Sequence, residues 1–370
     1  MSKKKSTVAR WVTFLCALIA LDYLFEFQLF EKVNQTPLSL ETFDGTGQAY
    51  HPSVLYLEEA WSGYHYWMAE SPYPIGALPY RGRWECPSIH VSNDGLHWQT
   101  PKGLSNPIDD LLPSEIQNRD FFSDPHLVFK DGQLECLYRY SENTPDGYHT
   151  SLVRKTSKDG ILWKERELLL DFLNPACIDS VGDMVRSPAI LWQNNRYRMW
   201  YVDNADPKGA KQVCYSESFD GINWSKAKTC ILEGYPIDPW HLDLALLDEE
   251  YVLTLYDFHD LTLWKSDDGL SFVYSKTLLS PSGVPGSFYS DGLYRSSLIQ
   301  DPEGYKLYFS AFDDRQTRIG LMEGNKMDEL QVVSVHGPNK TLLGFIKPFL
   351  MIWKIRLWRV QQHIIGVNPS

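Results

Sequence analysis

The chain has 370 residues, 14% of them aromatic, with 13 Trp, 21 Tyr, 22 Pro and 24 Gly. This composition favours many short strands joined by turns over helices. The net charge of −12 argues against nucleic acid as a partner, because phosphate binding needs a basic surface.

The N-terminal segment, residues 1–32, is predicted to be a membrane anchor. Lys3, Lys4, Lys5 and Arg10 precede an uncharged apolar run over residues 11–21, which is the pattern of a signal anchor. The run is shorter than the ~20 residues that span a bilayer, so an interfacial or core-packing helix is the alternative. Spanning would place the rest of the chain outside the cytoplasm, as a single-pass protein.

Residues 45–335 contain a repeated turn with the pattern S-x-D-G-x-x-aromatic. Ser and Asp side chains accept hydrogen bonds from nearby backbone N–H groups, and Gly supplies the positive φ of a tight turn. Each copy is flanked by short apolar runs, as in a hairpin. The four copies occupy residues 92–98, 157–163, 218–224 and 266–272.

A pair of short strands precedes each turn motif, and a fifth pair, at residues 295–299 and 305–311, has no motif after it. Five units of four antiparallel strands predict an all-β, five-bladed β-propeller. If the first strand of each unit starts at the upper end of the propeller, the S-x-D-G turns lie at the lower end and have a structural role.

The upper end is then predicted to hold the binding site. Charged and imidazole side chains begin the first strands, acidic residues end the second strands, and a Trp-Glu pair begins the third strand of the first unit. A funnel of this composition suits sugars, because aromatic rings stack on pyranose faces and carboxylates bind hydroxyl pairs. The first-strand residues are His51, Asp124, Arg186, His241, Asp243 and Arg295; the second-strand residues are Glu70, Glu142, Asp203, Asp257 and Asp313; the pair is Trp84 and Glu85.

Between Tyr50 and Met322 the sequence resembles the five-bladed carbohydrate-active propellers of glycoside hydrolase families 43, 62, 32, 68 and 130. The resemblance rests on the S-x-D-G-x-x-W turns and on inner strands that open with H-P-S, S-D-P and R-S-P. It implies an Asp in the first blade, an Asp in the second and a Glu in a later one. Only Asp124 matches, since His51 and Arg186 stand at the other two positions.

Three interpretations follow. The first is a glycoside hydrolase-like enzyme that acts on a saccharide, with Asp124 paired with Glu85, Asp243 or Asp291, or with His51 as a base. The second is a non-catalytic propeller in which Arg186 and Arg295 bind an anionic sugar. The third is a protein-interaction scaffold that uses the rim.

The remaining features concern metals, thiols and the C-terminus. No cofactor is expected, although His51, His241 and Asp243 could hold a divalent cation at the axis. Cys214 and Cys230 either pair or stay buried free thiols. Residues 340–370 are basic and aromatic, so this segment either lies on an anionic membrane surface or covers an apolar edge.

Overall fold

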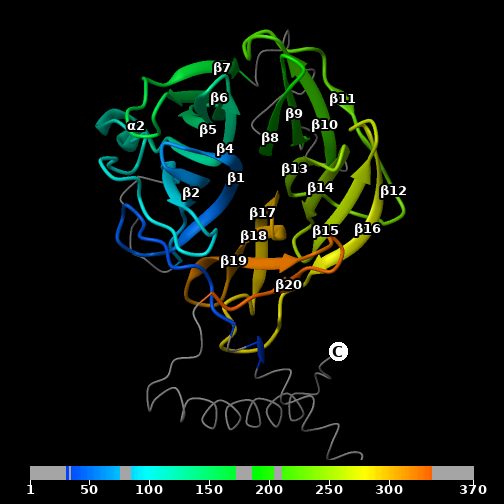
Figure 1. Ribbon diagram of the computed structural model, residues 1–370. Helices are drawn as coiled ribbons and strands as arrows, with labels where there is room; N and C mark the ends of the chain where they lie inside the picture. Colours follow the sequence, from blue (N-terminus) through cyan, green and yellow to red (C-terminus); the bar gives the residue numbers. More distant parts are fainter. Residues whose placement is uncertain (1–30, 33–34, 76–84, 172–185, 204–210, 336–370) are drawn as a thin grey trace, which may run out of the picture.

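The computed structural model describes residues 31–32, 35–75, 85–171, 186–203 and 211–335. Their strands form five sheets, and these surround one central axis (Figure 1). These described residues contain little helix, mainly the short α2 (Pro113–Asn118). The predicted five-bladed β-propeller is therefore confirmed.

Each sheet is one blade, and its strands follow one another from the axis outward. Blade 1 holds β1 (Ala49–Trp61), β2 (Tyr64–Pro72) and β3 (Ser88–Ser92); blade 2 holds β4 (Phe121–Lys130), β5 (Gln133–Thr144), β6 (Gly147–Ser157) and β7 (Glu167–Asp171). Blade 3 holds β8 (Arg186–Gln193), β9 (Arg196–Asp203), β10 (Gln212–Ser218) and β11 (Lys228–Thr229). Blade 4 holds β13 (His241–Leu247), β14 (Glu250–Tyr256), β15 (Leu261–Ser266) and β16 (Ser271–Leu279), with β12 (Ile231–Glu233) parallel to β16. Blade 5 holds β17 (Gly292–Asp301), β18 (Gly304–Phe312), β19 (Thr317–Gly324) and β20 (Gln331–Val332).

The apolar core is divided into five clusters, and each joins two neighbouring blades. Leu137 of blade 2, for example, shares a cluster with Ile190 and Met199 of blade 3. A single blade has no partner of its own for these side chains, so the blades are stable only as a ring.

The S-x-D-G turns have the predicted local geometry. In the first copy, the backbone N–H of Gly95 donates to Ser92 Oγ at 3.0 Å, and the N–H of Leu96 donates to Asp94 Oδ1 at 2.8 Å. The indole N–H of Trp98 closes the turn by donating to the carbonyl of Gly95 at 3.0 Å. Gly95 has a φ of +71°, the left-handed region that glycine favours.

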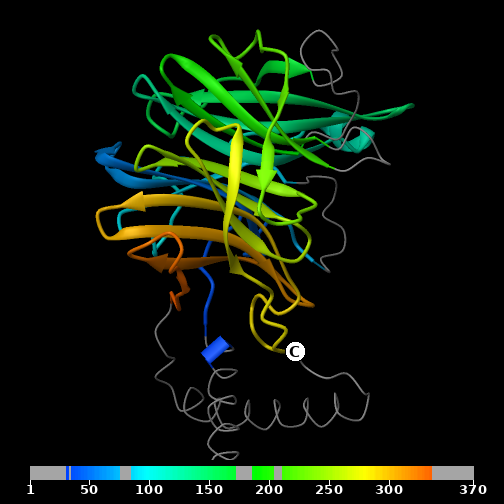
Figure 2. The same ribbon diagram turned by 90° about the vertical axis from the view of Figure 1, so that its right-hand side faces the viewer.

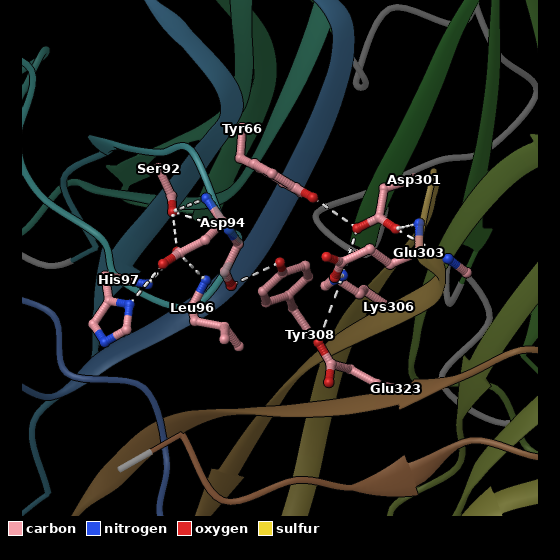
Figure 3. A network of polar contacts seen from close by, with 12 residues as sticks. Tyr66, Ser92, Asp94, Leu96, His97, Asp301, Glu303, Lys306, Tyr308 and Glu323 are labelled. Atoms are coloured by element: carbon pink, nitrogen blue, oxygen red, sulfur yellow. Dashed lines mark hydrogen bonds and ion pairs between the residues drawn. The ribbon is translucent and has the colours of Figure 1, made fainter. Parts of the chain in front are cut away.

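These turns also attach a blade to the one before it. The hydroxyl of Tyr308, from blade 5, donates to the carbonyl of Gly95 in blade 1 at 2.9 Å (Figure 3). In the same way, the indole N–H of Trp200 in blade 3 donates to the carbonyl of Gly269 in blade 4 at 2.7 Å. The motif is therefore an inter-blade contact as well as a hairpin.

Where the ring closes, a hydrogen bond joins blade 1 to a buried ion pair of blade 5 (Figure 3). Lys306 is 2% exposed, and its Nζ lies 2.5 Å from Asp301 Oδ2 and 3.1 Å from Glu303 Oε2. The hydroxyl of Tyr66 in blade 1 donates to the same Asp301 carboxylate at 2.7 Å. Residues 35–38 add further closing contacts, among them the N–H of Leu38 to the carbonyl of Ile319 at 2.8 Å.

The predicted anchor at residues 1–32 and the basic segment at 340–370 fall almost wholly outside the residues that the structure describes. Within the described part of the chain, no helix is long and apolar enough to cross a membrane. Cys136, Cys214 and Cys230 are buried free thiols, so Cys214 and Cys230 are not paired.

Candidate active site in the upper cavity

A cavity of about 710 Å³ opens at the upper end of the propeller axis. The inner strands β1, β4, β8, β13 and β17 all contribute to its wall. Five of the predicted site residues line it: His51, Glu85, Asp124, Arg186 and His241. We call it the upper cavity.

Three inner strands enter the upper cavity through the same strained bulge. His51 in β1, Asp124 in β4 and Ser187 in β8 each precede a proline and have φ values of 52°, 53° and 50°. The ladder register shifts at each of these points. Non-glycine residues at positive φ cost about 1–3 kcal/mol each and cluster at functional sites. Ser187, not Arg186, is therefore the blade 3 equivalent of Asp124.

Asp124 is the charged centre of the site. Its Oδ2 accepts from Arg139 Nη1 at 3.1 Å and from the backbone N–H of Ser187 at 3.1 Å. Burial opposes ionisation of this carboxyl, but its interactions with His241 and with the guanidiniums of Arg139 and Arg295 outweigh burial and hold its pKa well below the usual range. Asp124 is therefore a carboxylate throughout the physiological range.

Glu85 is the opposite case. Burial raises its pKa well above the usual value, the negative charge of Asp124 raises it further, and Arg139 opposes both. Its Oε2 lies 3.2 Å from Nδ1 of His51, whose pKa burial lowers to about 4. One cavity thus holds an ionised carboxylate and a carboxyl that favours its protonated form.

His241 connects Asp124 to Ser187. Its Nδ1 lies 2.8 Å from Ser187 Oγ and 3.6 Å from Asp124 Oδ1. Burial lowers the pKa of His241 well below its ordinary value, so the imidazole is neutral. Its Nε2 is buried and has no hydrogen-bond partner among the residues that the structure describes, so it is available to a bound molecule.

Aromatic rings and one guanidinium form the rest of the wall. The guanidinium of Arg186 lies over the ring of Trp240, with its Cζ 3.5 Å from the ring centroid. Trp240 is held by a 3.2 Å hydrogen bond from its indole N–H to the hydroxyl of Tyr294, and by Phe258 at a centroid distance of 4.3 Å. Phe258 also lines the cavity, and it is 51% exposed.

Two predicted site residues lie deeper along the axis. Arg295 is fully buried and lines neither end of the axial channel. Asp243 lines a separate cavity of about 300 Å³ at the lower end, beside His126. The predicted cation ligands are thus divided between two cavities, and in the part of the chain that the structure covers, no three His, Cys, Asp or Glu side chains form a metal-binding group.

The acidic residues at the ends of the second strands do not line the upper cavity. Glu70 is fully buried against His90, with Oε1 3.2 Å from Nε2, and Glu142 is exposed. Asp257 and Asp313 accept backbone N–H groups of their own turns. Asp203 and Asp291 are also outside the lining, and Trp84 lies outside the described residues.

Sequence reasoning missed Arg139, Ser187, Tyr294 and Trp240. The His-Pro, Asp-Pro and Ser-Pro dipeptides that open β1, β4 and β8 were a usable signal for Ser187. Arg139 lies inside the alternating strand β5 and belongs to no motif, so only its distance from Asp124 identifies it.

No protein-family model matches the chain. An A type blood N-acetyl-α-D-galactosamine deacetylase of Flavonifractor plautii is 29% identical over 308 residues, 69% of this chain and 38% of that protein, so the chain spans well under half of its relative. A crystal structure of an N-acetylgalactosamine deacetylase from F. plautii, in complex with blood group B trisaccharide, has a TM-score of 0.62 at 24% identity and covers 74% of this chain and 89% of that one.

A family 43 enzyme from Xanthomonas citri, crystallised with xylotriose, has a TM-score of 0.53 at 10% identity, covering 84% of this chain and 98% of that one. The likeness to these structures is one of fold. The chain is therefore similar to carbohydrate-active five-bladed propellers, as the sequence resemblance predicted, and the similarity includes a deacetylase as well as glycosidases.

Proposed function

We propose that the chain is a carbohydrate-active hydrolase that removes the acetyl group from an N-acetylated amino sugar bound in the upper cavity. The reaction consumes one water and turns the amide into acetate and a free amine. One observation carries the proposal: the equivalent bulges of β1, β4 and β8 present His51, Asp124 and Ser187, not several carboxylates. The deacetylase relative supports the same choice of bond.

Glu85 is the proton carrier in this proposal. A general acid must hold its proton until the substrate takes it, and the raised pKa of Glu85 suits this role. Asp124 and the imidazole of His51 have pKa values too low for it. Because Glu85 is protonated before the reaction, it would give its proton to the departing nitrogen and regain one from the water whose hydroxide adds to the carbonyl carbon.

The guanidiniums stabilise the charge that develops on the amide oxygen. Arg186 is fixed against Trp240, so its donors are oriented before the substrate binds. Asp124 stays ionised and orients Arg139 and the Ser187 backbone. The exposed ring of Phe258 offers a stacking surface for a pyranose.

Glycoside hydrolysis is the second candidate. It is favoured by the presence of one protonated and one ionised carboxyl in the same cavity. A glycosidase needs one protonated carboxyl as the acid and one carboxylate on the other side of the bond, and Glu85 and Asp124 have those two states.

Product analysis separates these candidates. The purified chain is incubated with oligosaccharides ending in N-acetylgalactosamine or N-acetylglucosamine, with and without added divalent cations, and acetate, free amine and new reducing ends are measured. Acetate with amine, abolished in Glu85→Gln and kept in the control Glu142→Gln, supports deacetylation. Reducing ends alone support the glycosidase. Saccharide binding without either product would support a non-catalytic propeller that only binds the saccharide.

A membrane anchor at the N-terminus remains a proposal that rests on the basic and apolar residues before position 22. Protease protection of the propeller in sealed vesicles, lost on detergent treatment, would test the extracytoplasmic placement.

A further inference from the structure

The fully buried Arg295 is unexplained by the proposed chemistry, since it does not line the upper cavity. It comes from β17 in blade 5, where the ladder register shifts between Leu293 and Ser296. This bulge lies next to the axis, and the guanidinium contacts blades 2 and 3. Burying a guanidinium is costly unless its charge and donors are satisfied, so its contacts should be informative.

The contacts of Arg295 converge on the two strained bulges. Nη1 donates to the carbonyl of Pro125 at 3.0 Å, and Nη2 reaches the carbonyl of Pro188 at 3.5 Å. These prolines directly follow Asp124 and Ser187, the residues held at φ of 53° and 50°. The guanidinium thus joins the backbones of both bulges from below.

A second link joins the same bulges from above. The backbone N–H of Ser187 donates to Asp124 Oδ2 at 3.1 Å. Two linked bulges, each at positive φ, persist only if the surrounding contacts determine their geometry. Without the guanidinium, the carbonyls of Pro125 and Pro188 would lose this shared donor.

We propose that Arg295 is a positioning residue that holds the Asp124-Pro125 and Ser187-Pro188 bulges together and so fixes the Asp124 carboxylate and the Ser187 hydroxyl in the upper cavity. This role rests on the proposed function only in its kinetic consequence. The structural consequence, the left-handed backbone at residues 124 and 187, can be measured without any turnover.

Arg295 has a further contact on its other side. Nη2 lies 3.2 Å from Nδ1 of His126, and the same Nδ1 lies 3.8 Å from Oδ1 of Asp243. Loss of the guanidinium would therefore remove a partner of His126 as well as the shared donor of the two proline carbonyls.

The test compares Arg295→Met, which keeps length but loses charge and donors, with Arg295→Lys, which keeps charge but has one nitrogen in place of the two that reach the carbonyls. Arg154→Met is the matched control, since Arg154 is largely buried, ion-paired and outside the upper cavity. Folding is checked by thermal unfolding and near-ultraviolet circular dichroism. The kinetic readout is kcat and KM, measured separately, for acetate release.

For Arg295→Met we expect at least a 100-fold fall in kcat with KM changed less than threefold. Arg295→Lys should lose at least 10-fold in kcat, and Arg154→Met should match the wild type once folded. A folded Arg295→Met within threefold of the wild type would overturn the proposal.

Crystal structures of the variants test the role of Arg295 without a substrate. If the wild type releases no acetate, the proposed function fails, and the role of Arg295 is then judged only from the backbone conformation of residues 124 and 187. Relaxation of Asp124 or Ser187 to ordinary extended geometry supports the proposal, and retention of both left-handed conformations overturns it. If Arg295→Met does not fold, Arg295→Lys carries the same measurements; failure of both to fold would assign Arg295 to folding and overturn the positioning role.

Discussion

Removing the charge of Asp124 should change the protonation of Glu85. Burial is the largest cause of the raised Glu85 pKa, and the negative charge of Asp124 is the next. In Asp124→Asn the side-chain shape is kept and this second cause disappears. A nearby charge typically moves a pKa by about 1–3 units, so we expect the Glu85 pKa to fall toward its ordinary value. One unit corresponds to about 1.4 kcal/mol between the two protonation states.

The assay is a pH titration of the glutamate side-chain carboxyl by carbon-13 NMR. Glu85→Gln identifies the signal by removing it, and the exposed Glu142 provides an internal comparison within the same spectrum. In the wild type, the Glu85 signal should titrate above the ordinary glutamate value of about 4.3. In Asp124→Asn it should titrate closer to that value.

The same pKa shift has a consequence for stability. A carboxyl whose pKa is raised in the folded state holds a proton that the unfolded chain releases. Its contribution to stability is fully present below about pH 4.3 and is lost as pH rises through the raised folded value. Glu85→Gln should therefore gain stability relative to the wild type between pH 4 and pH 8, measured by urea unfolding.

Two results would refute this reasoning. One is a wild-type Glu85 that titrates at the ordinary glutamate value, which would mean that the carboxyl is effectively solvated. The other is a raised Glu85 pKa that does not change in Asp124→Asn, which would remove the electrostatic coupling between the two carboxyls. Either result would leave Glu85 without a basis as the proton carrier.

Three further predictions concern the scaffold and the wall of the site. Gly160→Ala should cost about 1–3 kcal/mol in urea unfolding, because a Cβ there would lie 2.2 Å from the ring of Trp67. Gly132→Ala is the control, because Gly132 has nearly the same φ (+73° against +76°) and a Cβ there would have no atom within 4 Å. An equal loss of stability in both variants would mean that the turn at Gly160 is not in tight contact with the neighbouring blade. Asp301→Asn should lose about 3 kcal/mol of stability by leaving the buried Lys306 with weaker partners, and an unchanged melting temperature would count against the ring-closing role of this ion pair. Phe258→Ala should weaken saccharide binding about fivefold in calorimetry with little change in stability, since its ring is half exposed on the cavity wall; unchanged affinity would remove it from the sugar-binding surface.

The local part of the fold could be predicted from the sequence because its causes are local. The Ser, Asp and Gly of each turn satisfy one another within a few residues, as in Ser92 to Gly95, so four copies predicted the blades and their phase. The docking of Tyr308 on Gly95 joins residues more than 200 positions apart, and no short pattern predicts such a contact.

The site shows the same division. Asp124 could be identified because a Ser-Asp-Pro motif contains it, whereas Arg139 is one polar residue in an alternating strand. The acidic residues at the strand ends misled the prediction of the site. Asp257 and Asp313 accept hydrogen bonds from backbone N–H groups of their own turns. This local role repeats from blade to blade, as the residues of a shared site would. Burial, which determines the different pKa values of Asp124 and Glu85, depends on the assembled ring.

The central claim is that the upper cavity hydrolyses an N-acetylated sugar, and the most direct measurement is acetate release from N-acetylgalactosamine-terminated oligosaccharides by the wild type and by Glu85→Gln. The account predicts acetate and free amine in equal amounts from the wild type, and at least a 100-fold lower rate from a folded Glu85→Gln. Reducing ends without acetate, or an unchanged rate in Glu85→Gln, would contradict it.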